Sequence, residues 1–487
     1  MLIADLMAQS GVGFGTSGAR GRVADMTPEV CYAYTRAFLR HLAQTGGLHA
    51  GSRVAIAGDL RPSTPDIMSA VALAVSDAGC EPVNCGFIPS PAVAFHGMEE
   101  GIPSIMVTGS HIPDDRNGIK FNKADGEILK EDEAAIRAQE VEIPDGLAAR
   151  LEGALPDEDT TARQRYLDRY LAFFPADALA GRKVAVYQHS SVARDLLPEI
   201  LRGLGAEVLE LGRSGTFIPV DTEAIRPEDA DLARRWAGEH GFDAIVSTDG
   251  DADRPLIGDE HGEWLRGDVA GPLCARFLGV QRVVTPVSSN TLVEKCGWFD
   301  RVLRTRIGSP YVIAGMQQAG EGGAIVAGYE ANGGFLLGSD VSCGGRRLRA
   351  LPTRDAVIVI LSLLLAARWE GKPLSALVEA LPQRFTASDR LKEFPTERSR
   401  EVIAGFLTEN GGGDAAAIEA VFGELCGKVA ATDTTDGLRI TFENGEIVHL
   451  RPSGNAPEFR CYNEAATPER AATLNRTCID ILTTYRP

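Results

Sequence analysis

The sequence lacks the usual marks of a membrane or secreted protein. Its longest apolar run, Ala356 to Ala367, is interrupted only by Ser362. At about 1.5 Å per helical residue this run is too short to cross a bilayer, so we expect a buried core helix there. The segment Met1 to Gly11 contains Asp5 and no basic residue, which is not typical of a signal peptide. These absences predict a cytoplasmic protein with no membrane partner.

Cysteine and positive charge are also scarce. The nine cysteines include no Cys-x-x-Cys pair, so neither a disulfide framework nor a zinc site is indicated, and free thiols are expected. The chain has 49 Lys and Arg against 67 Asp and Glu, a net charge of −18, which argues against nucleic acid as a partner. The apolar content of 44% excludes wholesale disorder. At roughly 150 residues per domain, the length predicts about three domains.

Short β-branched runs alternate with helical stretches through most of the chain, which predicts α/β domains with mixed, largely parallel sheets. Strands are expected at Val54–Asp59, Lys183–Tyr187 and Arg282–Val287. Helices are expected to follow them at Thr64–Ala78, Val192–Gly203 and about Asn290–Cys296. Further strands that end at unusual loops are expected at Ser104–Val107, Ala244–Val246 and Ala324–Ala327. Because ligands of open α/β sheets bind beyond the carboxyl ends of strands, three tandem domains would each present one loop.

The C-terminal part has a different pattern. Leu438–Phe442 and Ile447–Leu450 are predicted to form a hairpin with an Asn-Gly turn. Helices are predicted to flank it at about Thr396–Phe406 and Pro468–Thr483. This α+β pattern adds a smaller fourth domain, and the expected boundaries are 1–150, 151–262, 263–386 and 387–487.

The most informative loop is Asp249-Gly-Asp-Ala-Asp-Arg254, which follows an apolar strand. Its carboxylates alternate with small residues, so all three can face one side of an extended segment. Carboxylates about 5 Å apart repel by about 3 kcal/mol per pair, and a hard cation such as Mg²⁺ removes that cost. The loop therefore predicts a magnesium site at Asp249, Asp251 and Asp253, with a solvated acidic turn as the alternative. An EF-hand is excluded because its later ligands are missing.

A second loop places Ser110 between a glycine and a histidine at the end of an expected strand. Ser110 is a candidate nucleophile, although taken alone it is more simply read as the N-cap of the next segment. His111 could be a base or a locally satisfied histidine, and Lys120 by itself would be a surface lysine. Two other loops, Phe14–Gly21 with Arg20 and Arg451–Pro457 with Arg460 behind it, have the glycines and guanidinium groups of anion cradles.

Taken together and in this order, these loops and Glu330-Ala-Asn-Gly333 resemble those of the α-D-phosphohexomutase family, over essentially the whole chain. Within the family the chain looks most like bacterial phosphomannomutases, on Phe217–Ala224 and Ser453–Tyr462. The resemblance implies a fold of three tandem α/β domains and a smaller C-terminal α+β domain around a central cleft.

The resemblance also implies a role for each loop. Ser110 would carry a phosphoryl group as phosphoserine, and one Mg²⁺ would be held by a phosphoserine oxygen and the three aspartates, Asp249, Asp251 and Asp253. The residues expected at the reacting end are Arg20, His111, Lys120 and Arg254, with Lys120 or Arg20 the better candidates for proton transfer. Those expected to bind sugar hydroxyls are Glu330 and Asn332. Those expected to grip the other phosphate are Arg451, Ser453, Gly454, Asn455 and Arg460.

The activity implied is a mutase that interconverts mannose 6-phosphate and mannose 1-phosphate through a hexose 1,6-bisphosphate, which also serves as activator. It would feed nucleotide-sugar and polysaccharide synthesis. Phosphoglucomutase or phosphoglucosamine mutase is the near alternative. Rivals from other classes are a non-catalytic sugar-phosphate sensor and a Mg²⁺-dependent phosphatase with an aspartyl nucleophile. The expected partners are hexose phosphates, and the expected assembly is a monomer or a homodimer.

Several loop positions depart from the family pattern. The departures are Gly109 where alanine is common, Ile112 where asparagine is common, Ala252 where glycine is common, Asn332 where serine is frequent, and Gly334 where some members have histidine. No departure removes the serine or an aspartate, so they bear on the choice of sugar rather than on the reaction.

Overall fold

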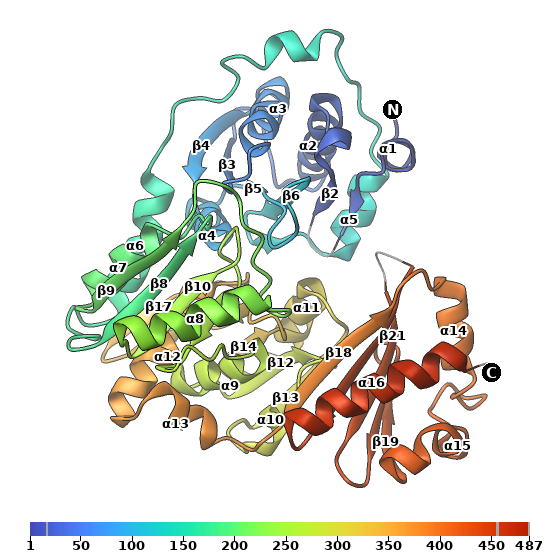
Figure 1. Cartoon of the computed structure of the whole chain (residues 1–487). Helices are drawn as coiled ribbons and strands as arrows, with labels where there is room; N and C mark the ends of the chain where they lie inside the picture. Colours follow the sequence, from blue (N-terminus) through green and yellow to red (C-terminus); the bar gives the residue numbers. More distant parts are fainter. Residues whose placement is uncertain (16–17, 454–456, 486–487) are drawn as a thin grey trace.

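In the computed structural model, which describes residues 1–15, 18–453 and 457–485, four main sheets follow one another along the chain (Figure 1). The first has the order β1-β2-β6-β5-β3-β4, with β7 beside β6. Its strands are β1 (Gly13–Phe14), β2 (Ala19–Arg22), β3 (Arg53–Gly58), β4 (Glu81–Phe87), β5 (Ser104–Val107), β6 (Arg116–Lys123) and β7 (Gly126–Glu127). Its helices are α1 (Ile3–Ser10), η1 (Val23–Asp25), α2 (Pro28–Gln44), α3 (Thr64–Asp77), α4 (Ser90–Glu100), α5 (Lys130–Arg137) and η2 (Leu147–Arg150).

The second and third sheets have four strands each, in the orders β11-β10-β8-β9 and β13-β12-β14-β15. The second sheet and its helices comprise α6 (Thr161–Phe173), β8 (Lys183–His189), α7 (Leu196–Gly203), β9 (Glu207–Arg213), α8 (Pro227–His240), β10 (Ala244–Thr248) and β11 (Pro255–Gly258). The third part comprises α9 (Gly267–Phe277), β12 (Arg282–Pro286), α10 (Leu292–Lys295), β13 (Arg301–Thr305), α11 (Ser309–Ala319), β14 (Val326–Tyr329), β15 (Phe335–Leu337), the hairpin β16 (Val341–Cys343) and β17 (Arg346–Leu348), α12 (Ala356–Glu370) and α13 (Leu374–Glu379).

One arrangement recurs in these three sheets. A buried strand that pairs in parallel with its neighbour ends in a short loop, and the chain then returns as an antiparallel strand. The strand pairs are β5 and β6, β10 and β11, and β14 and β15. The three loops between them are the serine, acidic and Glu-x-Asn-Gly loops predicted from the sequence, so each stands at the carboxyl end of a core strand.

Helix α12 is the predicted apolar helix, and it is buried along nearly its whole length. It lies in a hydrophobic core that joins residues of the first three sheets. In the described part of the chain, no helix is long and apolar enough to span a bilayer. All nine cysteines are free, as expected.

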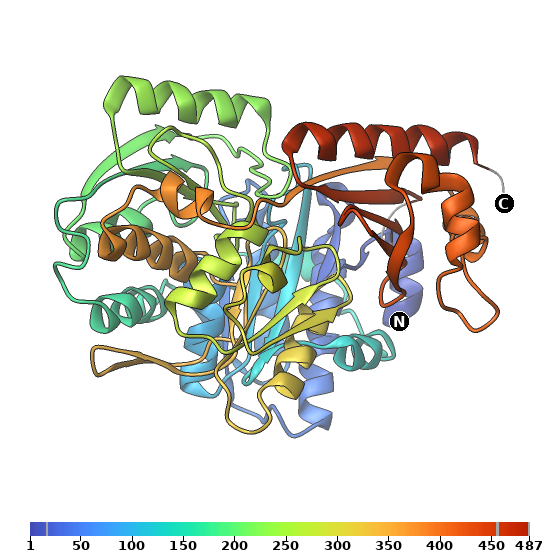
Figure 2. The same cartoon turned by 90° about the horizontal axis from the view of Figure 1, so that it is seen from below.

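The fourth sheet is antiparallel, in the order β18-β22-β21-β20-β19, and has a core of its own. Its strands are β18 (Phe385–Leu391), β19 (Val429–Asp433), β20 (Leu438–Phe442), β21 (Ile447–Pro452) and β22 (Phe459–Ala465). Its helices are α14 (Thr396–Ala404), α15 (Ala415–Cys426) and α16 (Pro468–Thr484). This part stands to one side of the other three, with α16 lying along the sheet (Figures 1 and 2). The α+β prediction and the hairpin of β20 and β21 are thereby confirmed.

One predicted helix begins later than expected. Residues 192–195 form turns and α7 starts only at Leu196. The physical reason is Pro198, which lacks an N–H and is tolerated in the first turn of a helix but not in its interior.

Candidate active site

The serine loop is held in a strained conformation. Ser110 has φ of 57°, which costs a residue with a Cβ roughly 1–2 kcal/mol. Its N–H donates to Thr108 Oγ1 (2.7 Å), and its hydroxyl donates to Asp249 Oδ2 (2.6 Å). Residues 111–115 form no helix and lead into β6 at Arg116, so Ser110 caps no helix and the N-cap interpretation is wrong. The strain turns the hydroxyl toward the acidic loop.

Arg61, which the sequence reasoning missed, holds the backbone of this loop through hydrogen bonds. It is 1% exposed, and its Nε donates to Asp59 Oδ2 at 3.0 Å. The two terminal nitrogens donate to four backbone carbonyls of the loop and its end at 2.6–3.0 Å, those of Ser110, Ile112, Pro113 and Arg116. All five N–H donors of the guanidinium are therefore used. Its plane also lies over the Phe217 ring, 4.1 Å from the centroid.

The acidic loop is buried, which rules out the solvated turn. Asp249, Asp251 and Asp253 are at most 2% exposed, and each can offer an oxygen within 4.8 Å of the others. Ala252 has φ of 58°, and the bend lets Asp249 Oδ1 accept the N–H groups of Asp253 and Arg254 (3.2 Å each). Burial, followed by the charges of the two other aspartates, raises the pKa of Asp249 well above its usual range.

These carboxylates fit a divalent cation. Oδ1 of Asp251 and Oδ1 of Asp253 are buried without a hydrogen-bond partner among the described residues, although such atoms normally have one. The ligand set is oxygen only, as Mg²⁺ prefers. Ser90 donates a hydrogen bond to the other oxygen of Asp251 and so fixes that side chain.

Lys120 is not a surface residue. It is 8% exposed, and its Nζ donates to Asp251 Oδ2 (2.6 Å) and Asp253 Oδ2 (2.7 Å). Burial opposes its charge, but the two carboxylates outweigh burial and raise its pKa. β6 carries Lys120 beside β2, which carries Arg20. Burial, followed by the charge of Arg254, lowers the pKa of Arg20 to about 10.

His111 accepts a hydrogen bond from an arginine. Arg254 Nη1 donates to its Nδ1 (2.8 Å), and burial together with the Arg254 charge lowers the pKa of His111 to about 3. The ring is therefore a neutral acceptor, which is the satisfied-histidine interpretation.

The Glu330-Ala-Asn-Gly333 loop, called the sugar loop below after the role that the resemblance implies, meets the acidic loop through Arg354. The sequence reasoning missed this second arginine. Glu330 and Asn332, in the turn between β14 and β15, are 4% and 9% exposed. Asn332 Oδ1 accepts the N–H of Gly334 (2.9 Å), which shapes the turn. Arg354 Nη1 donates to Glu330 Oε2 (3.0 Å), and its Nε donates to Asp253 Oδ2 (3.1 Å).

The fourth sheet contributes residues to a cavity beside His111 and Arg254. Arg460 lines a cavity of about 290 Å³ together with His111 and Arg254. Tyr462 and Asp221, which sequence reasoning did not assign, line it too. Of the other residues predicted on this sheet, Arg451 pairs in register with Arg460 and donates to Asp436 Oδ2 (2.8 Å), and Ser453 is buried. Gly454 and Asn455 lie outside the described residues.

Two departures from the family pattern have a steric cause. A Cβ on Gly109 would lie 2.6 Å from Cζ of Arg61, and one on Gly334 would lie 2.4 Å from Cδ of Arg354. Each glycine therefore leaves room for a buried arginine, and neither arginine could keep its place beside an alanine or a histidine. Nothing in the structure explains Ile112.

Comparison with known proteins places the whole chain in one family. Four models match in order: phosphoglucomutase/phosphomannomutase α/β/α domain I at residues 11–143, domain II at 164–262, domain III at 266–385, and the C-terminal domain at 406–480. A phosphomannomutase of Sinorhizobium fredii is 47% identical over 95% of this chain and 96% of its own length. A phosphomannomutase of Salmonella muenchen is 44% identical over 98% of this chain and 96% of its own length.

More distant relatives and solved structures agree. A phosphoglucosamine mutase of Symbiobacterium thermophilum is 29% identical over 90% of this chain and 96% of its own length. The crystal structure of a putative phosphomannomutase from Thermus thermophilus covers 97% of this chain and 99% of its own, with a TM-score of 0.74 at 23% identity, and so shares the fold. On the four domain matches and the two close relatives, the chain belongs to the phosphoglucomutase/phosphomannomutase family of mutases.

Proposed function

We propose that the protein is a phosphohexomutase that interconverts mannose 6-phosphate and mannose 1-phosphate, with Ser110 as the residue that carries the phosphoryl group. The observation behind the reaction is the Ser110 hydroxyl, 2.6 Å from a buried aspartate cluster that a lysine partly neutralises. The choice of mannose rests on identities of 44% and 47% to phosphomannomutases, against 29% to a phosphoglucosamine mutase.

In the forward step a hydroxyl of the bound sugar attacks the phosphorus on Ser110. The P–O bond to the serine breaks as the P–O bond to the sugar forms, the sugar hydroxyl loses a proton, and the serine oxygen gains one. We assign this proton transfer to Lys120 or Arg20. Asp249 receives the hydrogen bond of the restored hydroxyl. Trapping of a covalent phosphate on Asp249 would favour the aspartyl-nucleophile alternative.

Charge neutralisation is the main demand of phosphoryl transfer. Asp249, Asp251, Asp253 and an oxygen of the Ser110 phosphate would hold one Mg²⁺, which supplies positive charge for the transferring group when bound. Arg254 sits within 4.0 Å of Asp249 and Asp253 and faces the cavity with His111, so it can contact the same phosphate.

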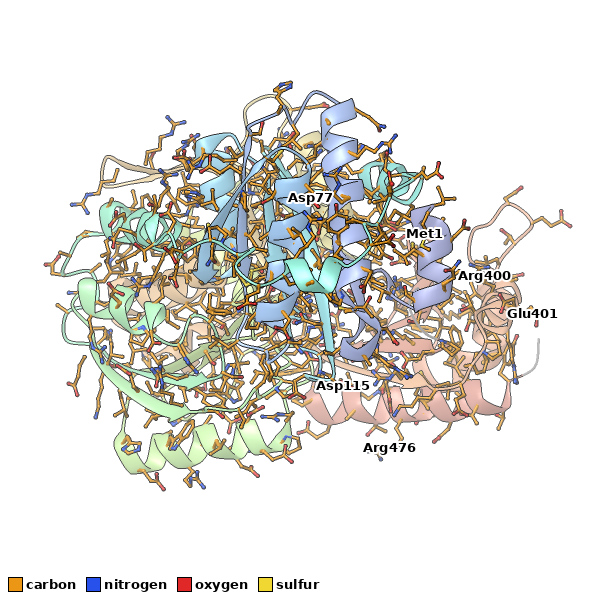
Figure 3. The ribbon with its side chains drawn as sticks, turned by 90° about the horizontal axis from the view of Figure 1, so that it is seen from above. Met1, Asp77, Asp115, Arg400, Glu401 and Arg476 are labelled. Carbon is orange, nitrogen blue, oxygen red and sulfur yellow. The ribbon has the colours of Figure 1, made fainter. Side chains whose placement is uncertain are left out.

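The product of the first step is a hexose 1,6-bisphosphate, and its second phosphate must return to Ser110 after the sugar turns around. We assign the sugar hydroxyls to Glu330 and Asn332 in both orientations. We assign the binding of the phosphate that does not react to residues of the C-terminal part, namely Arg451, Ser453, Gly454, Asn455 and Arg460. Charged side chains of both signs, such as Asp115, Arg400 and Arg476, lie on the exterior (Figure 3). The cavity also has both signs, because Arg254, Arg390 and Arg460 line it together with Asp221, Glu223 and Asp389.

We further propose a cytoplasmic location, a monomer or homodimer, and domains bounded at 1–150, 151–262, 263–386 and 387–487. A role in supplying nucleotide-sugar and polysaccharide synthesis belongs to the same proposal.

The test is kcat/KM on mannose 1-phosphate, glucose 1-phosphate and glucosamine 1-phosphate, with Mg²⁺ and a hexose 1,6-bisphosphate as activator. Mannose 1-phosphate should be the best substrate, and equal or better turnover of glucosamine 1-phosphate would overturn the choice of sugar. Intact-mass analysis should find one phosphate on the parent after bisphosphate treatment and none on Ser110→Ala. If the unsubstituted protein never acquires phosphate, the mutase proposal is refuted and the sugar-phosphate sensor remains the alternative.

A further inference from the structure

Each of three consecutive residues before α12, Thr353 to Asp355, contacts a distant part of the chain. Thr353 Oγ1 donates to Glu127 Oε1 of β7 (2.6 Å). Asp355 caps α12 through the N–H of Val357 (3.1 Å) and accepts hydrogen bonds from two tyrosines of α6, Tyr166 and Tyr170. Arg354 lies between these two residues. Their contacts therefore restrain its backbone on both sides, independently of the contacts of its own side chain.

The Arg354 side chain lies between the acidic loop and the sugar loop. It is 3% exposed, and its bonds to Asp253 Oδ2 (3.1 Å) and Glu330 Oε2 (3.0 Å) join residues 101 and 24 positions away in the sequence. A guanidinium can hold two carboxylates in fixed directions at once, whereas an ammonium is a single point of charge. Asp253 and Glu330 are therefore held at a set distance from each other.

Gly334 provides the space for this side chain. A Cβ at that position would lie 2.4 Å from Cδ and 2.7 Å from Cγ of Arg354. The sugar loop of this chain is thus built around the arginine, and the contact is more than a chance ion pair at its edge.

We propose that Arg354 is a positioning residue of the mutase site, an inference that rests on the proposed function. By engaging Oε2 of Glu330 it leaves Oε1 for a sugar hydroxyl. Its bond to Asp253 holds the guanidinium in the position from which it reaches Glu330. Arg354 acts through Glu330 and does not itself touch the reacting atoms.

Arg354→Gln and Arg354→Lys in the full chain test this. Both should raise KM for the hexose phosphate about 10- to 100-fold, the usual loss when a partner that orients a functional side chain is removed, with a smaller fall in kcat. The matched control is Arg346→Gln, because Arg346 is exposed on β17, and it should keep both constants. The decisive experiment is a double-mutant cycle on kcat/KM with Glu330→Gln.

If Arg354 acts through Glu330, adding Arg354→Gln to Glu330→Gln costs less than about threefold further. Losses that multiply, or a lysine variant with the parental KM, would refute the inference. Thermal unfolding midpoints report any general loss of stability, which by itself does not change KM at a temperature where the variant is folded. A parent without turnover would defeat the proposed function and this inference together, whereas an active parent with silent Arg354 variants would defeat this inference alone.

Discussion

The serine loop should depend on Arg61 for both its stability and its reactivity. Arg61→Lys keeps the charge but has three donors in place of five, so at least two of the loop carbonyls or Asp59 lose their partner. Asp59 and Ser110 are buried and Arg61 itself is 1% exposed, and an unmade hydrogen bond to a buried group costs about 1–3 kcal/mol. Two to three such losses agree with the 3–5 kcal/mol typical of a broken buried ion pair. We expect a fall of about 3–5 kcal/mol in the free energy of unfolding.

The substitution should also lower the activity of the variant that remains folded. Ser110 stays at φ of 57° only because its surroundings impose it, and the Arg61 bond to its carbonyl (2.8 Å) is part of that restraint. Displacing a nucleophile by about 1 Å can cost about 100-fold in rate, so kcat/KM should fall about 100-fold or more at temperatures where the variant is folded.

The assays are denaturant unfolding, steady-state kinetics, and amide hydrogen exchange over residues 109–116, which should speed up in the variant. Arg40→Lys is the matched control, since Arg40 is an exposed arginine of the same sheet unit, bonded to one carbonyl, and should change stability by less than about 0.5 kcal/mol. An Arg61→Lys protein within 1 kcal/mol and threefold of the parent, by the scales used above, would refute the reasoning.

Two further predictions concern the acidic loop and the fourth sheet. Ala252→Gly should change the free energy of unfolding by less than about 1 kcal/mol, because relief of the left-handed conformation (φ 58°) offsets the entropy and burial that the methyl group contributed. Gly250→Ala, by contrast, places a Cβ 2.8 Å from the carbonyl oxygen of Ser110 and should reduce turnover more than about tenfold. If unfolding and kinetic assays found Ala252→Gly to be the more damaging of the two substitutions, the result would contradict this geometry. Burial lowers the pKa of His449 to about 4, below the roughly 6.5 of an unfolded histidine. The unfolded chain therefore binds this proton first, and stability is lost as pH falls from about 6.5 to about 4, by up to about 1.4 kcal/mol per pH unit. His449→Gln should flatten that part of the profile in denaturant unfolding at stepped pH, and an unchanged slope would count against the buried, neutral ring.

Several parts of the fold and site could be read from local pattern. The core strands before the three loops, the hairpin of β20 and β21, and the apolar helix α12 follow from periodicity and turn residues that lie close together in the chain. The predicted start of α7 at Val192 is four residues early, because apolar periodicity does not show the restriction that Pro198 places on the helix. Ser110 and Lys120 had local interpretations, as a cap and a surface residue, that the tertiary structure overturned.

The sequence by itself determined that three carboxylates gather in one loop, because Asp249, Asp251 and Asp253 lie within five residues at the end of one strand. Only the tertiary structure decided what the long cationic side chains do. Lys120 meets Asp251 and Asp253 from 131 and 133 residues away, Arg61 meets the serine loop from 49, and Arg354 meets Asp253 from 101. A flexible arginine or lysine has no preferred partner in its own segment. Its role is therefore set by which carboxylates and carbonyls the packing of sheets from different parts of the chain leaves buried around it.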